Sequence, residues 1–139
     1  MRILALAALS LALPGAAQPA APPETVQVRL SSFDFTPASL RLRAGVPILL
    51  RLENSSGGGH NFSAPQFFAA ARIEPADAGL VRRGTIEVPS HSVREIRLVP
   101  AAGRYRLRCT HSLHTAFGMK GSILVEQAGL APNLTSAPP

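Results

Sequence analysis

The chain is 139 residues long, carries 14 Lys and Arg against 8 Asp and Glu, and contains one cysteine. This length suits a single domain with its own core, and one cysteine excludes an internal disulfide. The net charge of +6 does not indicate nucleic-acid binding, because the basic residues are not interleaved with aromatic ones, which make up only 5% of the chain. We therefore expect a small basic domain that does not bind nucleic acid.

The first 17 residues have the pattern of a secretory signal peptide. Arg2 precedes the apolar run ILALAALSLAL, and the small residues Gly15 and Ala17 stand where a signal peptidase cleaves. The apolar run is shorter than the roughly 20 residues of a membrane helix, and no later stretch approaches that length. We therefore predict a signal peptide at residues 1–17 and export to the periplasm, with no membrane span.

Pro- and Ala-rich segments flank the central part of the chain. QPAAPPE precedes it and APNLTSAPP follows it, and both compositions are unlike those of packed structure. We predict flexible segments at residues 18–23 and 127–139 and one domain at residues 24–126. We expect this domain to be a monomer.

From residue 25 onward, apolar residues alternate with polar ones, which is the period of half-buried β-strands. In the first such segment, Val26, Val28 and Leu30 share one face. The alternating segments, in chain order, are TVQVRL, LRLR, PILLRLEN, GTIEV, SVREIRLV, GRYRLRC and GSILVE. This spacing predicts an all-β fold, a Greek-key β-sandwich of about seven to eight strands.

One segment breaks the alternation. SAPQFFAAAR, residues 63–72, predicts a short helix in a loop, with Ser63 as its N-cap and the Gln66 side chain returning the hydrogen bond. The Pro, Gly and charged residues of EPADAGLVRRG then predict a surface connection between strands. His91, in VPSHSVRE, lies at an expected turn, and we predict that it is exposed.

The segment CTHSLHTAFGMKG gathers the only cysteine, two of the four histidines and the only methionine besides Met1. Alternation in GRYRLRC points Tyr105, Leu107 and Cys109 inward, so Cys109 ends a strand and faces the interior. Met119 stands at the start of the next strand. The loop between the two strands should therefore bring Cys109 close to Met119.

Thiolate, imidazole and thioether are soft or intermediate donors. Two His, one Cys and a weakly held Met form the ligand set of blue copper sites, whereas zinc more usually recruits further Cys, His or carboxylate ligands. Because the loop supplies at least one imidazole, a second has to come from elsewhere in the chain. The candidate is His60, which follows the glycine-rich stretch NSSGGG, although a lone histidine after glycines is more often an ordinary loop residue.

GHNF, followed about fifty residues later by YRLRCTHSLHTAFGMKGSILV, resembles the cupredoxins, the plastocyanin- and azurin-like small blue copper proteins. The resemblance covers most of residues 24–126 and includes FDFTPASLRLRAG. It implies one type 1 copper ion bound by His60, Cys109 and His114, with Met119 as the axial ligand.

The resemblance also implies a role for Asn61, whose side chain would tie the two ligand-bearing segments together by hydrogen bonding near Thr110. The alternative is an ordinary turn asparagine. His111 departs from the family pattern. Only one residue separates His111 from Cys109, so both side chains could reach one ion only by straining the turn. We therefore predict that His111 lies beside the metal or at the surface and does not bind it.

The resemblance implies an exported blue copper protein that cycles between Cu(I) and Cu(II) and passes one electron between redox partners, such as a cytochrome or a copper enzyme. Docking would be weak and transient, near His114, where Leu113, Ala116 and Phe117 supply an apolar patch. Arg104, Arg106 and Arg108 are the solvated face of a strand or a row that orients an acidic partner.

Three alternatives remain open. A periplasmic copper carrier or storage protein would use the same ligands and hand copper to a partner. An enzyme is not expected, because the loop has no Asp, Asn or Glu to orient a Cys/His pair and the chain lacks the further histidine clusters of a multicopper enzyme. A sandwich that has lost its metal would bind no copper.

Overall fold

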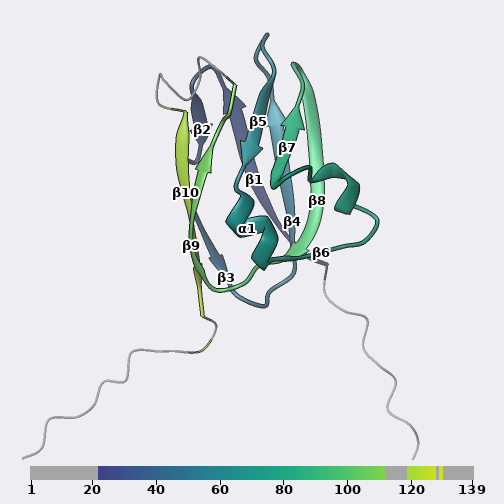
Figure 1. Ribbon diagram of the computed structural model, residues 1–139, viewed down its shortest axis with the longest axis vertical. Coiled ribbons are helices and arrows are strands. Elements are labelled where there is room, and N and C mark those ends of the chain that lie inside the picture. The colour runs from purple at the N-terminus through teal and green to yellow at the C-terminus, as the bar shows by residue number, and fades with distance from the viewer. Residues whose placement is uncertain (1–21, 112–118, 128, 130–139) are drawn as a thin grey trace, which may run out of the picture.

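The computed structural model describes residues 22–111, 119–127 and 129, which build two facing β-sheets (Figure 1). One sheet has the strand order β2-β1-β4-β8-β6 and the other the order β3-β10-β9-β5-β7. Within the described residues the strands are β1 (Glu24–Ser31), β2 (Asp34–Thr36), β3 (Ser39–Arg43), β4 (Ile48–Asn54), β5 (His60–Ser63), β6 (Arg72–Ile73), β7 (Thr85–Val88), β8 (Ser92–Val99), β9 (Gly103–Arg108) and β10 (Lys120–Glu126). The predicted all-β sandwich is confirmed.

Three strands of the described structure, β2, β5 and β6, do not correspond to any of the alternating segments in the sequence, and all three are short. β2 and β6 have three and two residues, too few for alternation to reveal them. In β5 all four residues are buried, so the segment does not alternate in burial. These strands are defined by their pairing with β1, β8 and β7, which is a tertiary property.

Alternating burial in the longer strands builds the core between the sheets. In β4, Ile48, Leu50 and Leu52 are each at most 2% exposed, as their spacing predicts. Each such side chain contributes about 1.5–3 kcal/mol when it leaves water. β4 pairs with β1 in parallel and with β8 in antiparallel orientation, so this face is fixed from both sides.

The predicted short helix is present as α1 (Pro65–Ala70), but the predicted cap is wrong. The N-cap residue is Ala64, and no side chain caps the helix. Ser63 instead ends β5, where it lies opposite Thr85 and its hydroxyl accepts a hydrogen bond from Thr85 Oγ1 at 2.9 Å. Ser63 is therefore part of a paired strand, although the local sequence pattern predicts it as the helix N-cap.

Aromatic side chains anchor β5 and α1 to the core. Phe62 of β5 makes edge-to-face contacts with Phe35 and Phe68, at ring-centroid distances of 6.0 and 5.9 Å. Phe67 makes similar contacts with Phe68 and Tyr105, at 5.3 and 5.5 Å. Such pairs add about 0.5–1.5 kcal/mol each beyond area burial. The strand that carries His60 is thereby held firmly from the inside.

The segment after α1 runs over the surface, as predicted, and contains the short 3-10 helix η1 (Ala78–Leu80). Asp77 fastens it to β8. Its carboxylate accepts hydrogen bonds from Arg97 Nε and Nη2, each at 2.8 Å, and from the Arg97 backbone N–H at 2.9 Å. The Arg97 side-chain hydrogen bonds are the largest cause that lowers the pKa of Asp77 from 3.8 to about 2. His91 is exposed in the turn before β8, also as predicted.

The predicted signal peptide lies outside the described residues, and so does most of both predicted flexible segments. The domain boundaries at residues 24 and 126 therefore stay predictions, although β1 begins and β10 ends at these residues. In the part of the chain that the structure describes, no helix has the length and apolar character needed to cross a membrane.

Candidate metal centre

His60 is the first residue of β5 and is 1% exposed. It lies opposite Val88 of β7, and β5 continues next to β9 through the pair Ser63 and Arg108. The stretch of glycines before it forms the turn that returns the chain from β4 into the second sheet. The predicted imidazole is therefore buried where β5 begins.

Cys109 directly follows β9, and Met119 directly precedes β10. The Cys109 backbone N–H donates to the Met119 carbonyl oxygen at 3.1 Å, one step beyond the pair Arg108 and Lys120. The two residues thus face each other across an antiparallel ladder, where Cβ atoms lie about 4.5–5.5 Å apart. Both are completely buried, so thiol and thioether point into the sandwich together.

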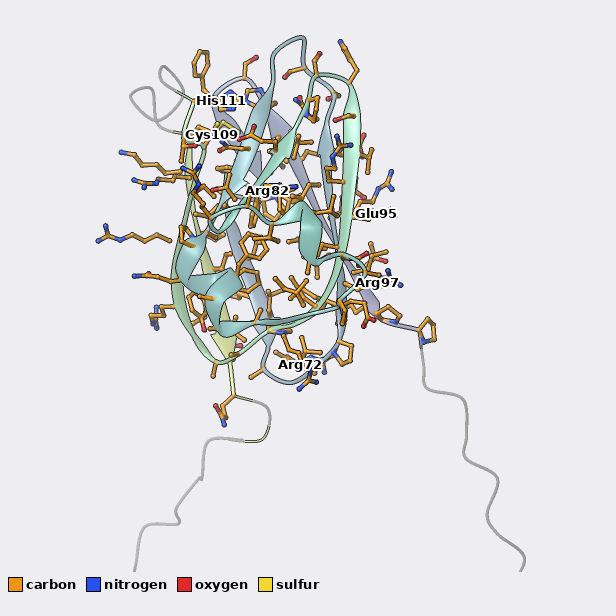
Figure 2. All side chains as sticks on the ribbon, turned by 45° about the vertical axis from the view of Figure 1, so that its right-hand side comes forward. Arg72, Arg82, Glu95, Arg97, Cys109 and His111 are labelled. Carbon is orange, nitrogen blue, oxygen red and sulfur yellow. The ribbon has the colours of Figure 1, made fainter. Side chains whose placement is uncertain are left out.

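The register of β5 and β9 relates His60 to these two residues. Ser63 pairs with Arg108 in antiparallel orientation, so extending the same register by one residue places Phe62 opposite Cys109. His60, two residues before Phe62, is then a diagonal neighbour of Cys109. Diagonal neighbours on one face of a sheet remain within reach of each other. In Figure 2, Cys109 and His111 lie near one end of the sandwich, and Arg72 lies near the opposite end. His60, Cys109 and Met119 therefore share the inner face of one sheet at one end.

Asn61 links the two segments that carry His60 and Cys109. Its Oδ1 accepts from the Thr110 backbone N–H, and its Nδ2 donates to Thr110 Oγ1, both at 2.8 Å. Asn61 is 1% exposed, so these bonds lie largely out of water. The hydrogen bond between Asn61 and Thr110 that the resemblance implies is present.

Glu87 of β7, which no sequence pattern singles out, joins this arrangement. Its Oε1 accepts from Asn61 Nδ2 at 2.9 Å, and its Oε2 lies 3.1 Å from His111 Nε2. The His111 side chain is 38% exposed. His111 thus lies at the surface beside the segments that carry His60 and Cys109, and its exclusion as a ligand stays a prediction.

Ser56, in the turn before His60, and Asn54, the last residue of β4, also escape prediction from the sequence. Ser56 Oγ lies 2.8 Å from His60 Nε2, and Asn54 accepts from Ser56 through Oδ1. The only signal in the sequence is the polar run NSS before the glycines, which is equally typical of any turn.

His114 lies outside the described residues, as do Leu113, Ala116 and Phe117. Among the residues that are described, no group of three or more His, Cys, Asp and Glu side chains could hold a metal ion. Within the described ranges, the buried His, Cys and Met donors at this end are the imidazole of His60, the thiol of Cys109 and the thioether of Met119. These fit copper and not magnesium or calcium, which bind oxygen ligands.

Cationic side chains line the outer face of the same sheet. Arg104, Arg106 and Arg108 of β9 are exposed, and Arg108 lies opposite the exposed Lys120 of β10. No ion pair recorded within the described ranges involves these four residues. We call them the basic row. It runs along β9 toward Cys109.

A family model described as multicopper oxidase matches residues 40–129. Solved structures with similar folds include reduced auracyanin from the photosynthetic bacterium Roseiflexus castenholzii, at 19% identity and a TM-score of 0.55, covering 73% of this chain and 96% of that one. Auracyanin B matches at 22% identity and a TM-score of 0.55, covering 78% of this chain and 92% of that one. No curated protein sequence matches the chain significantly.

Proposed function

Since the chain belongs to the multicopper oxidase family and has the cupredoxin fold, we propose that it is a type 1 blue copper protein that transfers single electrons between redox partners. The observation that carries this proposal is the burial of His60, Cys109 and Met119 on one inner face at one end of the sandwich. A thiol opposite a thioether, next to a buried imidazole, supplies three of the four donors of a blue copper site. The fourth donor is a second imidazole.

In this proposal His114 supplies that second imidazole, Cys109 the thiolate and Met119 the weak axial thioether. Copper bound there supplies a one-electron couple between Cu(I) and Cu(II). The chain's part is to keep its donors in nearly the same positions in both oxidation states, so that little has to rearrange when an electron moves. The core contacts of Phe62 and the Asn61–Thr110 hydrogen bonds serve this rigidity.

We propose that partners dock at the end of the sandwich that carries the donors, near His114. Phe33, in the turn after β1, is 42% exposed. β1 runs parallel to β4, with Leu30 opposite Asn54, so Phe33 lies at the same end as the turn before His60. An exposed aromatic there adds to the apolar patch expected from Leu113, Ala116 and Phe117. Weak and brief docking needs only a small interface.

The basic row favours a partner with an acidic surface. Its four cations have no recorded ion pair in the described structure to neutralise them, so their field extends into solvent beside the proposed docking end. Complementary charge mainly raises the association rate and orients the encounter. This suits an electron carrier, which has to bind and leave quickly.

The family's name refers to oxidases, but we propose that this chain is not an enzyme. Multicopper enzymes need further histidine clusters, and this sequence has four histidines, two of which, His91 and His111, are at least partly exposed. The signal-like residues 1–17 support export, and we propose the periplasm as its location.

The test is to add Cu(II) to the purified protein and to the Cys109→Ser variant and to record visible absorption and a voltammogram. An intense charge-transfer band that requires Cys109, together with a reversible one-electron wave, is the expected result. A colourless protein would contradict the proposal. Copper that passes readily to a metal-free acceptor without a reversible wave would favour the copper carrier.

A further inference from the structure

The turn between β4 and β5 contains a chain of hydrogen bonds that ends on His60. Asn54 is the last residue of β4, and Ser56 lies between it and His60 in the sequence. Asn54 is 1% exposed, and Ser56 is half-buried. A role for this turn in copper binding rests on the proposed function of His60 as a ligand, but its first test does not need copper.

The orientation of the Asn54 amide is fixed by its neighbours. Nδ2 lies 2.8 Å from the Gly58 carbonyl oxygen, 3.0 Å from that of Val88 and 3.1 Å from that of Pro89. Carbonyl oxygens only accept hydrogen bonds, so the atom that faces all three has to be the NH₂ group. Asn54 Oδ1 therefore faces the other way, toward Ser56.

The orientation of the amide then decides where the Ser56 hydroxyl hydrogen points. Ser56 Oγ lies 2.7 Å from Asn54 Oδ1, and the Ser56 backbone N–H donates to the same oxygen at 3.0 Å. Two oxygens at 2.7 Å with no hydrogen between them would repel each other. The Gly58 carbonyl oxygen, at 3.2 Å from Ser56 Oγ, is a more distant acceptor for the same hydrogen. A hydroxyl has only one hydrogen, and the Ser56 O–H donates it toward Asn54 Oδ1. Ser56 Oγ therefore presents a lone pair to its third neighbour.

That neighbour is His60 Nε2, at 2.8 Å. Because Ser56 Oγ can only accept along this contact, Nε2 has to carry the hydrogen. A neutral imidazole with its proton on Nε2 has its lone pair on Nδ1. We infer that Asn54 and Ser56 are positioning residues that hold the His60 ring with its proton on Nε2 and its lone pair on Nδ1.

The chain of bonds is itself anchored at both ends. Ser90 Oγ donates to the Ser56 carbonyl oxygen at 2.8 Å, which ties the turn to the segment between β7 and β8. Asn54 is bonded to the backbone of both connections, through Gly58 in one and Pro89 in the other. The ring orientation and the tautomer are thus set by groups that are in place before a metal arrives. Mutation of a residue that hydrogen-bonds to a metal-binding histidine typically lowers metal affinity or activity by about 10–100-fold.

The first test is the tautomer of His60 in the metal-free protein. Two-bond ¹H–¹⁵N correlation spectra, recorded at about pH 8, where an ordinary imidazole is neutral, distinguish the two nitrogens directly. We expect an Nε2–H pattern for His60 in the wild-type protein. An Nδ1–H pattern would overturn the inference, whatever the protein does with copper.

The second test uses three variants. Ser56→Ala removes the acceptor, Ser56→Thr keeps a hydroxyl at the same position, and Ser55→Ala changes the exposed neighbour as a matched control. We expect Ser56→Ala to show a mixture of tautomers and roughly tenfold weaker Cu(II) binding, and the other two to resemble wild type. Wild-type affinity and an unchanged tautomer in Ser56→Ala would overturn the inference, and Ser56→Thr keeps the comparison valid if the alanine variant folds poorly.

The two proposals fail differently. If the protein binds no copper but His60 is in the Nε2–H form and loses it in Ser56→Ala, the proposed function is wrong and the positioning chain stands. If the protein is blue and Ser56→Ala leaves both tautomer and affinity unchanged, the function stands and the positioning role is wrong.

Discussion

Asn61 and Thr110 are joined by two hydrogen bonds of 2.8 Å, one from the Thr110 backbone N–H to Asn61 Oδ1 and one from Asn61 Nδ2 to Thr110 Oγ1. Each residue stands next to a proposed ligand, His60 on one side and Cys109 on the other. The pair therefore fixes the distance between two segments that lie far apart in the sequence.

Asn61→Ala should destabilise the protein by about 1–3 kcal/mol, because the buried Asn61 side chain loses its hydrogen bonds to the Thr110 N–H, to Thr110 Oγ1 and to the Glu87 carboxylate. Thr110→Val is the matched control. It removes only the bond to Oγ1 and should cost about 1 kcal/mol or less. Urea unfolding of the metal-free proteins measures both. Equal losses in the two variants would show that the backbone bond to Asn61 contributes nothing.

The sequence predicts Asn61 only through the family resemblance, and it does not predict Glu87 or Ser56 at all. Cys109 and Met119 could be found because their donor atoms are chemically rare and because alternation gives their direction. Glu87 is a polar residue on an outward strand position, like many others. Its contact with Asn61 depends on the register of β5 against β7, which no local pattern contains.

His111→Ala should keep the blue band and His114→Ala should abolish it. His111 Nε2 lies 3.1 Å from Glu87 Oε2 at the surface, so its loss should remove one exposed contact worth about 0–1 kcal/mol and leave the proposed copper ligands intact. Absorption spectra of the two copper-loaded variants decide the matter. A colourless His111→Ala with a blue His114→Ala would reverse our assignment of the second imidazole.

Met119→Gln should lower the reduction potential while copper stays bound. An amide oxygen is a harder ligand than a thioether and favours Cu(II) over Cu(I), and the axial position tunes the potential of such sites. A tenfold change in the ratio of the two oxidation states corresponds to about 59 mV, and we expect a shift of at least this size in voltammetry. Ile123→Val, a buried change in β10, is the control and should leave the potential in place. An unchanged potential in Met119→Gln would remove Met119 from the axial position.

The helix start shows why part of the fold is hidden from local reasoning. Ser63 followed by Pro65 and Gln66 reads as a capped helix start, and α1 does begin at Pro65. Ser63 itself belongs to β5, because pairing with Thr85 on one side and Arg108 on the other keeps its backbone extended. A cap is a local preference worth about 1 kcal/mol, and pairing on both sides of a central strand exceeds it.

Stability should fall in acid partly through Asp77. Its folded pKa of about 2 lies below the ordinary 3.8, because hydrogen bonds from Arg97 favour the charged form. A lowered pKa contributes stability that is fully present above about pH 4 and is lost as the pH falls toward about 2. Asp77→Asn should therefore be less stable than wild type at neutral pH, and the difference should disappear near pH 2.

A double-mutant cycle with Arg97→Gln isolates this effect from other carboxylates. Denaturant unfolding at neutral pH should show a favourable coupling between Asp77 and Arg97, and the same cycle near pH 2 should show little. A coupling that persists unchanged in acid would mean that the pair is held by something other than the charge on Asp77.

The basic row predicts how the charge of a redox partner affects the reaction rate. Arg106→Glu with Arg108→Glu should slow the oxidation of the copper-loaded protein by the anion hexacyanoferrate(III) by about tenfold at low salt, because the local attraction becomes repulsion. Oxidation by cationic tris(phenanthroline)cobalt(III) should instead become faster. Both effects should shrink as added salt shortens the Debye length from about 10 Å at 0.1 M to about 3 Å at 1 M.

The control for this prediction is a double reversal with the same net charge at the far end of the sandwich, Arg72→Glu with Arg43→Glu. Figure 2 shows Arg72 near the end opposite Cys109, and Arg43 is the last residue of β3. If net charge alone governed the encounter, both double variants would change the two rates equally. A larger effect from Arg106 and Arg108 locates electron entry beside the basic row, because only charges near the path of the oxidant bias its approach at moderate salt.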